Sequence, residues 1–214
     1  EVHRTKGRPI ASGALTINDA LILLSLLFSI ALLLLLTTNF TTVLIGIVCG
    51  ILTVAYPLFK RFFWWPQLIL GITFNCGALM GWSVIRDNLG AEAWLLYFGC
   101  IFWTLSYDTI YAHQDKIDDV KLNLRSTAIR FGENSRSWIG KFFTITEMFW
   151  LSMGVKMGVN YLFYCAMLLI SVIFFYQYKK LNFDNPKVCM YMFRISSIVP
   201  ILLFLGILFG KFKF

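Results

Sequence analysis

Seven apolar segments, each close to the length of a membrane-spanning helix, follow one another along this chain of 214 residues. They cover residues 15–36, 41–59, 67–85, 91–106, 138–155, 161–178 and 190–210. A helix needs about 20 apolar residues to cross a bilayer, and a helix satisfies its own backbone hydrogen bonds there. The fourth segment is short and the fifth contains Lys141 and Glu147, so these two are the least typical. The pattern predicts an all-α, polytopic transmembrane helical bundle of about seven helices.

Composition agrees with a membrane protein. Hydrophobic residues make up 58% of the chain and charged residues 14%, which is too apolar for a soluble domain of this size. The five cysteines have no metal-ligand spacing, and most lie inside apolar runs, so we expect them to behave as small hydrophobic residues rather than to form disulfides: Cys49, Cys76, Cys100, Cys165 and Cys189.

The basic residues orient the predicted bundle. If the N-terminal segment is cytoplasmic, that side holds fifteen of the 19 Lys and Arg residues, and the opposite side holds Arg86, Lys156, Lys211 and Lys213. Loops that stay in the cytoplasm carry an excess of Lys and Arg, so this bias supports an odd number of crossings. It also accounts for the net charge of +8 without a nucleic-acid partner.

An acidic stretch lies between the fourth and fifth segments, on the predicted cytoplasmic side. The sequence YDTIYAHQDKIDDVKLNLRSTAIR covers residues 107–130. If the whole stretch is one helix, Asp108, Asp115 and Asp119 fall within about 20° of a common line, with Tyr111 and Asp118 on one flank. Carboxylates at a bilayer surface need a divalent cation, a basic partner or water to offset their charge.

Two basic stretches share this predicted side. HRTKGRPIASG begins at His3, and KRFFWWPQ covers residues 60–67, where Pro66 is expected to start a helix. Carboxylates that hold Mg²⁺, together with cations that grip phosphate oxygens, would form a diphosphate site above apolar walls. Two other interpretations are a solvated loop and a small cation transporter. The isolated histidines His3 and His113 are expected at the surface.

Several of these motifs resemble the UbiA family of intramembrane prenyltransferases, in particular the 4-hydroxybenzoate polyprenyltransferases of ubiquinone biosynthesis. The acidic stretch resembles the second aspartate-rich motif of the family, and three further stretches agree with it: RTKGRPIASGALT, YPLFKRFFWWPQLILGITFNCGALMGW and KLNFDNPKVCMYMF. The resemblance spans nearly the whole chain. It implies a single membrane-embedded domain over residues 1–214, in a family whose members have nine transmembrane helices.

The resemblance also implies roles for individual residues. The second motif carries over onto Asp108, Tyr111, Asp115, Asp118 and Asp119. The expected catalytic residues are Asp108, Tyr111, Asp115 and Asp119, and the expected Mg²⁺ ligands are Asp115, Asp118 and Asp119. Asp115 and Asp119 are four residues apart, so both can reach one ion. The expected partners of substrate groups are Lys60, Arg61, Lys121, Arg125 and Asn75.

The implied reaction is Mg²⁺-dependent transfer of a polyprenyl group from polyprenyl diphosphate to the ring of 4-hydroxybenzoate. The implied location is the bacterial inner membrane or the mitochondrial inner membrane, with the aspartate-rich face on the cytoplasmic or matrix side. Related family members prenylate other quinone precursors or haem precursors, so a different acceptor is an alternative.

The first aspartate-rich motif of the family is missing from this sequence. It would end a few residues before RTKGRP, and the chain starts at Glu1. We therefore expect the domain to lack two N-terminal helices, since seven segments are nine minus two. The chain is then either one part of an active enzyme, completed by a separate N-terminal fragment, or an inactive truncated remnant.

Overall fold

A computed structural model describes residues 7–212 of the chain, and every regular element in this range is a helix. The predictions for His3, Arg4, Lys6 and Lys213 concern residues outside this range. The helices are α1 (Ile17–Leu36), α2 (Phe40–Phe62), α3 (Pro66–Phe74), α4 (Cys76–Arg86), α5 (Ala91–Ala112), α6 (Lys116–Lys121), α7 (Thr127–Phe131), α8 (Ser135–Met157), α9 (Tyr161–Lys180), α10 (Pro186–Ile195) and α11 (Ile198–Gly210), with a 3₁₀ turn at Gly132–Asn134. The prediction of an all-α bundle is confirmed.

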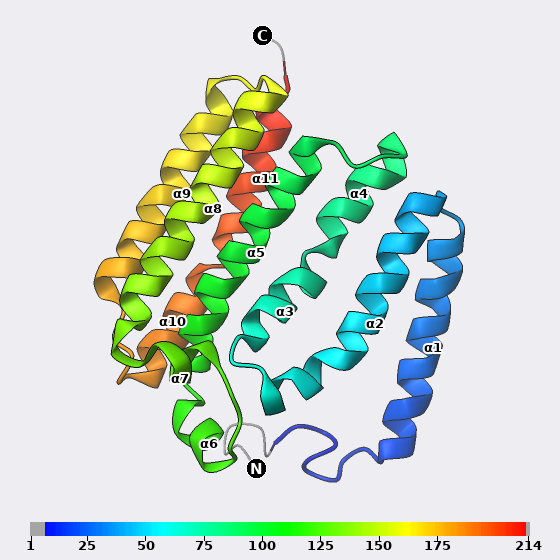
Figure 1. Cartoon of the computed structure of the whole chain (residues 1–214), viewed down its shortest axis with the longest axis vertical. Coiled ribbons are helices and arrows are strands. Elements are labelled where there is room, and N and C mark those ends of the chain that lie inside the picture. The colour runs from blue at the N-terminus through cyan, green and yellow to red at the C-terminus, as the bar shows by residue number, and fades with distance from the viewer. Residues whose placement is uncertain (1–6, 213–214) are drawn as a thin grey trace.

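The long helices run roughly along one direction and form the seven predicted crossings (Figure 1). Two crossings are broken into consecutive helices: α3 and α4 meet at Asn75, and α10 and α11 meet at Ser196 and Ser197. In the described residues, five crossings are long and apolar enough to span a membrane by composition alone: α1, α2, α3–α4, α9 and α10–α11. The other two, α5 and α8, match the two least typical segments of the sequence.

The pairing of α5 with α8 explains their more polar composition. These helices lie against each other along most of their length, and Trp150 of α8 is fully buried between them. Gly99 of α5 permits this contact, because a Cβ atom there would lie 2.3 Å from Nε1 of Trp150. A helix that faces protein on several sides does not need a continuous lipid-facing apolar surface.

Local signals in the sequence account for several helix ends. Thr16 and Asp19 form a reciprocal capping box at the start of α1. The Asn39 side chain caps α2, and Pro66 is the first residue of α3, as predicted. Gly158 ends α8 with a φ of 60°, a conformation that glycine adopts without strain.

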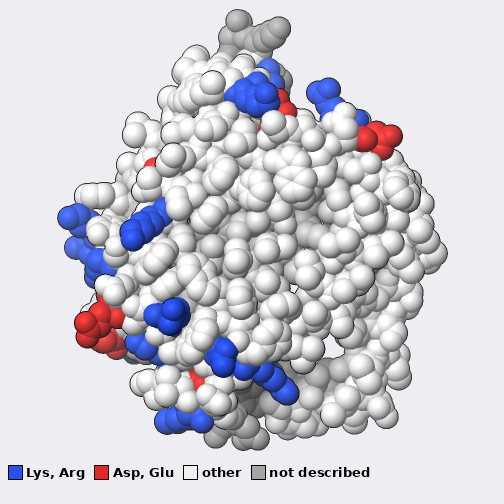
Figure 2. All heavy atoms as spheres, viewed as in Figure 1, with Lys and Arg blue, Asp and Glu red and all other residues white. Residues whose placement is uncertain are grey.

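The flanks of the bundle are apolar. No residue of α1 is buried, and many of its leucines are more than half exposed. In Figure 2, uncharged residues cover most of the visible face, and Lys and Arg lie mainly toward its lower and left edges and at its top. A continuous apolar surface of this size belongs in hydrocarbon, so the chain is an integral membrane protein.

The prediction that the cysteines do not form disulfides is wrong for one pair. Cys49 of α2 and Cys76 of α4 are bonded to each other, with Cα atoms 6.6 Å apart. Helices α2 and α4 lie side by side, which brings together two cysteines that are 27 residues apart in the sequence. Cys100, Cys165 and Cys189 are free, in agreement with the prediction.

Candidate functional site

The acidic stretch lies at one end of the bundle. Helices α6 and α7 are placed below α5 in Figure 1, at the end where α1 begins and α2 finishes, and opposite the end of α11. The 10 residues from Asp115 to Leu124 are separated from the end of α5 by two residues and contain all three predicted Mg²⁺ ligands.

The acidic stretch is not one continuous helix, so that prediction is wrong. Helix α5 ends at Ala112, and the next turn tightens, since the amides of Gln114 and Asp115 bond to carbonyl oxygens three residues earlier. Helix α6 starts after Asp115, whose φ is −101°. Asp108 is therefore on a different helix from Asp118 and Asp119. The common line calculated for one helix does not apply, although the pair Asp115 and Asp119 keeps a helical spacing.

Helix α6 turns its acidic side toward the protein. Asp119 is 2% exposed, and Asp115 and Asp118 are half-buried, whereas Ile117 and Val120 are exposed. The amide of Asp119 donates to the carbonyl oxygen of Asp115 over 2.8 Å, which holds the two residues one turn apart. The arrangement is inverted relative to a solvated loop, in which carboxylates face water and apolar side chains turn inward.

The last turns of α2 face these carboxylates. Tyr56 interacts electrostatically with both Asp108 and Asp119, and Lys60 interacts with Asp108. Two predicted site residues, Lys60 of α2 and Asp108 of α5, thus lie close enough to interact although they are 48 residues apart in the sequence. Arg61 is exposed on the next position of α2.

Arg125 ties the acidic segment to the end of α2. Its amide donates to the carbonyl oxygen of Lys60 over 2.8 Å, and its guanidinium donates to the carbonyl oxygen of Phe62. The guanidinium also lies over the ring of Trp64, 5.0 Å from its centroid, and Arg130 lies over the same ring at 5.9 Å. Trp64 therefore holds two cations, one of which, Arg125, directly follows the acidic segment in the chain.

A buried polar chain fixes the other end of the segment. The hydroxyls of Thr109 and Thr127 are 2.7 Å apart, and the amide of Thr127 donates to Oε1 of Gln67 over 3.1 Å. All three residues are almost fully buried. This chain joins α5, α7 and α3. These contacts were not predicted from the sequence, although the polar residue Gln67 stands out at the start of an apolar segment.

Asn75 and Tyr111 make contacts at two different depths in the bundle. The Asn75 side chain donates to Oγ1 of Thr104 over 2.8 Å, one turn before Asp108 on α5, and also to the carbonyl oxygens of Gly71 and Cys100. The ring of Tyr111 packs against Phe193 of α10 with centroids 4.6 Å apart, and Tyr107 reaches the same ring at 5.8 Å. Tyr107 and Tyr111, which flank Asp108 in α5, therefore pack together against α10.

Lys121 and His113 line a cavity that is separate from the carboxylate site. Lys121 is exposed at the end of α6. His113 is 7% exposed and packs on Phe183 with centroids 4.1 Å apart, so the prediction that it is a surface residue is wrong. Burial, with a smaller effect from Lys116, lowers the pKa of His113 to about 4.

The donor set suits Mg²⁺ bound together with a phosphate group. Within residues 7–212, no three His, Cys, Asp or Glu side chains form a ready-made metal cage. Mg²⁺ is commonly held by one or two carboxylates, with waters and substrate phosphates completing its shell. Asp115 and Asp119, one turn apart with cations nearby, provide such a partial set.

Comparison with known proteins agrees with this geometry. A sequence model described as the UbiA prenyltransferase family matches residues 1–198. The chain is 42% identical to a mitochondrial 4-hydroxybenzoate polyprenyltransferase of Aedes aegypti over 98% of this chain and 48% of that protein. It is 40% identical to the human protein of the same name over 99% of this chain and 57% of that protein. The chain thus spans about half the length of the curated relatives that it matches.

The fold is also similar to that of a solved protein. The apo structure of a UbiA homolog from Aeropyrum pernix K1 superposes with a TM-score of 0.82 at 20% sequence identity, and the match covers 96% of this chain and 77% of that one. At this level of identity the likeness concerns the fold alone. Together with the family match over most of the sequence, the comparisons show that the chain belongs to the UbiA prenyltransferase family.

Proposed function

We propose that this chain takes part in Mg²⁺-dependent transfer of a polyprenyl group from polyprenyl diphosphate to the ring of 4-hydroxybenzoate, a step of ubiquinone biosynthesis. The observation that carries the proposal is the inward-facing acidic side of α6, which lies beside Lys60 and Arg125 in a chain of this family. The relatives named as 4-hydroxybenzoate polyprenyltransferases support the choice of acceptor.

Asp115, Asp118 and Asp119 are the proposed ligands of Mg²⁺, with Asp108 next to them at the end of α5. Bound Mg²⁺ would neutralise the diphosphate and so improve it as a leaving group. The chain's own cations Lys60, Arg61 and Arg125 would bind the remaining phosphate oxygens, since guanidinium and ammonium groups both form charge-assisted hydrogen bonds to phosphate. We assign Lys121 the weaker role of attracting the anion from solution, because it lies on the outer side of α6.

The aromatic side chains below the carboxylates would receive the prenyl group. When the bond between C1 of the prenyl group and the diphosphate oxygen breaks, positive charge develops on the allylic carbons. The faces of Tyr107, Tyr111 and Phe193 can stabilise this charge. A ring carbon beside the phenol of 4-hydroxybenzoate then bonds to C1, and the ring loses one proton to restore aromaticity. Asn75 is placed one turn deeper, where it would orient a substrate group.

We also propose that the carboxylate site is completed by a polypeptide segment equivalent to the part of the relatives that this chain does not match. Two observations support the proposal: the chain spans 48% to 57% of two of those relatives, and no residue of α1 is buried. The domain of residues 1–214 would then contribute the second half of the binding site.

The proposed location is the inner membrane of mitochondria or bacteria, with α6 on the matrix or cytoplasmic side. The positive charges at this end of the bundle and the mitochondrial names of the relatives support this orientation.

The experiment is an assay of prenyl transfer in membranes that contain this chain, with Mg²⁺, a polyprenyl diphosphate and 4-hydroxybenzoate. The chain is tested alone and together with the N-terminal part of a relative. Activity in the combined sample supports the proposal. Transfer to another quinone precursor, but not to 4-hydroxybenzoate, would change the acceptor. No transfer to any acceptor, with both parts inserted and folded, would contradict the proposal and indicate an inactive remnant.

A further inference from the structure

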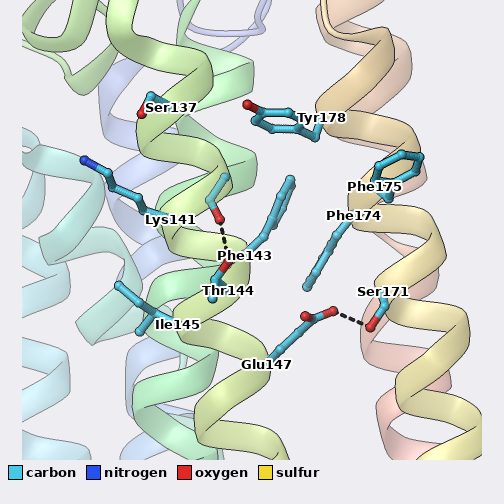
Figure 3. A pocket seen from close by; sticks show the side chains of 11 residues that line it. Ser137, Lys141, Phe143, Thr144, Ile145, Glu147, Ser171, Phe174, Phe175 and Tyr178 are labelled. Carbon is cyan, nitrogen blue, oxygen red and sulfur yellow. Dashed lines mark hydrogen bonds between the residues drawn. The ribbon is translucent and has the colours of Figure 1, made fainter.

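A groove between α8 and α9 lies outside the carboxylate site. It has a volume of about 760 Å³ and runs along the antiparallel pair of helices (Figure 3). Its floor is the stacked pair Phe143 and Phe174, whose ring centroids are 4.2 Å apart, and both residues are buried. Phe175 forms an exposed rim on the α9 side. The groove is thus an aromatic channel on a lipid-facing side of the bundle.

One end of the groove is closed by a hydrogen bond. Ser171 donates from Oγ to Oε1 of Glu147 over 2.6 Å, across the gap between the two helices (Figure 3). Glu147 comes 12 residues after the start of α8, which places it about 18 Å along the helix, near the middle of the membrane. A carboxyl group at that depth is costly without a partner, and the bond to Ser171 supplies one.

The other end of the groove opens among cations at the end of the bundle that carries α6. Arg136 lies 5.9 Å from the ring centroid of Tyr178, and Lys179 lies 5.6 Å from that of Phe175, and both rings line the groove. The stem of Lys141 lines the α8 edge, and its ammonium group is turned away from α9 in Figure 3, 4.7 Å from the ring of Trp138. Among the residues that line the groove, the acidic one is Glu147, at the closed end.

Close packing of Tyr178 on α8 gives this mouth its shape. A Cβ atom on Gly140 would lie 2.9 Å from the Tyr178 ring, so the missing side chain lets the ring lie across the helix. Arg136 donates to the carbonyl oxygens of Tyr178 and Leu181 and holds the end of α9 in place. The polar mouth is therefore built by fixed side chains, with Lys141 and Lys179 more exposed around it.

We propose that this groove binds an anionic phospholipid of the adjacent leaflet. The phosphate would sit at the mouth near Lys179, where the flexible side chain of Lys141 can swing to reach it, and one acyl chain would lie over Phe143 and Phe174 down to the Glu147–Ser171 bond. Basic pockets between transmembrane helices on the cytoplasmic or matrix side are suited to anionic headgroups. An acyl chain gains little by leaving other lipid tails for an apolar groove, so the charge of the headgroup provides the selectivity.

The test measures lipid retention rather than prenyl transfer, so its outcome is independent of the proposed reaction. Purified protein in detergent is mixed with phosphatidylglycerol or phosphatidylcholine of the same acyl chains, and the bound lipid is counted by native mass spectrometry. The double variant Lys141→Gln/Lys179→Gln is compared with Lys156→Gln/Lys187→Gln, which removes two exposed lysines away from the groove. A third variant, Thr144→Phe, fills the groove without changing charge.

The wild type should retain phosphatidylglycerol in preference to phosphatidylcholine. The Lys141/Lys179 variant should lose at least about fivefold of this retention, since each cation near a membrane surface contributes to the attraction. Thr144→Phe should also reduce it, the control pair should not, and an excess of inorganic phosphate should have little effect. Equal retention of both lipids, or an equal loss in the control pair, would overturn the proposal. Displacement by inorganic phosphate would instead indicate a site for the free anion and would also overturn it.

Discussion

At the residue scale, the proposed Mg²⁺ site is most directly tested at Asp115. It sits at the start of α6, half-buried, one turn from the buried Asp119. A carboxylate in this position can both ligate Mg²⁺ and neutralise part of its charge, whereas an amide of the same shape brings no negative charge.

The substitution Asp115→Asn should weaken Mg²⁺-dependent binding of a polyprenyl diphosphate analogue by about tenfold or more. Mutation of a residue that only hydrogen-bonds to a metal ligand already lowers metal affinity by about tenfold, and Asp115 is proposed as a ligand itself. Binding is measured by titration of the complete protein with and without Mg²⁺. The matched control is Asp184→Asn, an exposed aspartate in the loop before α10. Unchanged affinity in Asp115→Asn would refute its role as a metal ligand.

His113 gives the fold a defined response to acid. Its pKa is lowered to about 4, from about 6.5 in an unfolded chain, so the folded state favours the neutral ring. Above pH 6.5 His113 makes its full contribution to the free energy of unfolding. As the pH falls from 6.5 toward 4 this contribution is lost, and the free energy of unfolding decreases by at most about 1.4 kcal/mol per pH unit.

The variant His113→Phe keeps a ring against Phe183 but cannot be protonated. Its melting temperature should fall less steeply than that of the wild type between pH 6.5 and pH 4.5. The measurement is a series of thermal unfolding curves in detergent across this range. Parallel pH profiles for the two proteins would show that His113 is not the group responsible.

The nature and general location of the site residues could be predicted from the sequence, but their burial could not. The spacing of Asp115 and Asp119 and the basic run at Lys60 are visible in the sequence, and the structure places both at one end of the bundle. The burial of His113 depends on Phe183, 70 residues later, which local patterning does not reveal. The side of α6 on which Lys121 lies could not be predicted either, because it depends on how this short helix packs against the long ones.

At the scale of elements, the short helices α6 and α7 are positioned by contacts with long ones. The Arg125 guanidinium and amide bind carbonyl groups at the end of α2, and Thr127 binds Gln67 and Thr109. Helices of six and five residues are too short to be stable alone, so these tertiary bonds set their position.

Removing the Arg125 side chain should loosen this segment. In Arg125→Gln, amide hydrogen exchange over residues 115–124 should become faster, because the charge-assisted bond to the Phe62 carbonyl is lost. Arg130→Gln is the matched control, since Arg130 lies over the same Trp64 ring and no bond from its side chain to α2 is seen in the described residues. Equal exchange in both variants would mean that stacking on Trp64, rather than the bond to α2, holds the segment.

The variant Gln67→Leu should destabilise the protein by about 1–3 kcal/mol, since it leaves the buried amide of Thr127 without its acceptor. The melting temperature is compared with that of Asn88→Leu, a substitution at an exposed position between α4 and α5. A decrease no larger than that of the control would show that the bond from Thr127 to Gln67 contributes little.

Helix positions were the most predictable elements because long apolar runs determine them. The seven segments correspond to the seven crossings, but the breaks at Asn75 and at Ser196 were not predicted. At the first break the Asn75 side chain bonds across to α5, and at the second Ser196 accepts a hydrogen bond from Gln177 of α9. Both breaks rely on partners from other helices, which a local apolar pattern does not contain.

At the scale of the whole molecule, the bundle has two chemically different ends. The end with α6 carries the carboxylates, the cations around Trp64 and the mouth of the groove between α8 and α9, and α11 finishes at the opposite end. No residue of α1 is buried, and the chain matches 48% and 57% of the length of two of its relatives.

The measurement that tests this account most directly is prenyl transfer to 4-hydroxybenzoate in membranes where this chain is combined with the N-terminal part of a relative. The wild-type combination should transfer the prenyl group in the presence of Mg²⁺, and Asp115→Asn in this chain should abolish most of that activity while Asp184→Asn retains it. If Asp115→Asn were as active as the wild type, the acidic side of α6 would not be the site of the reaction, and the account would be wrong.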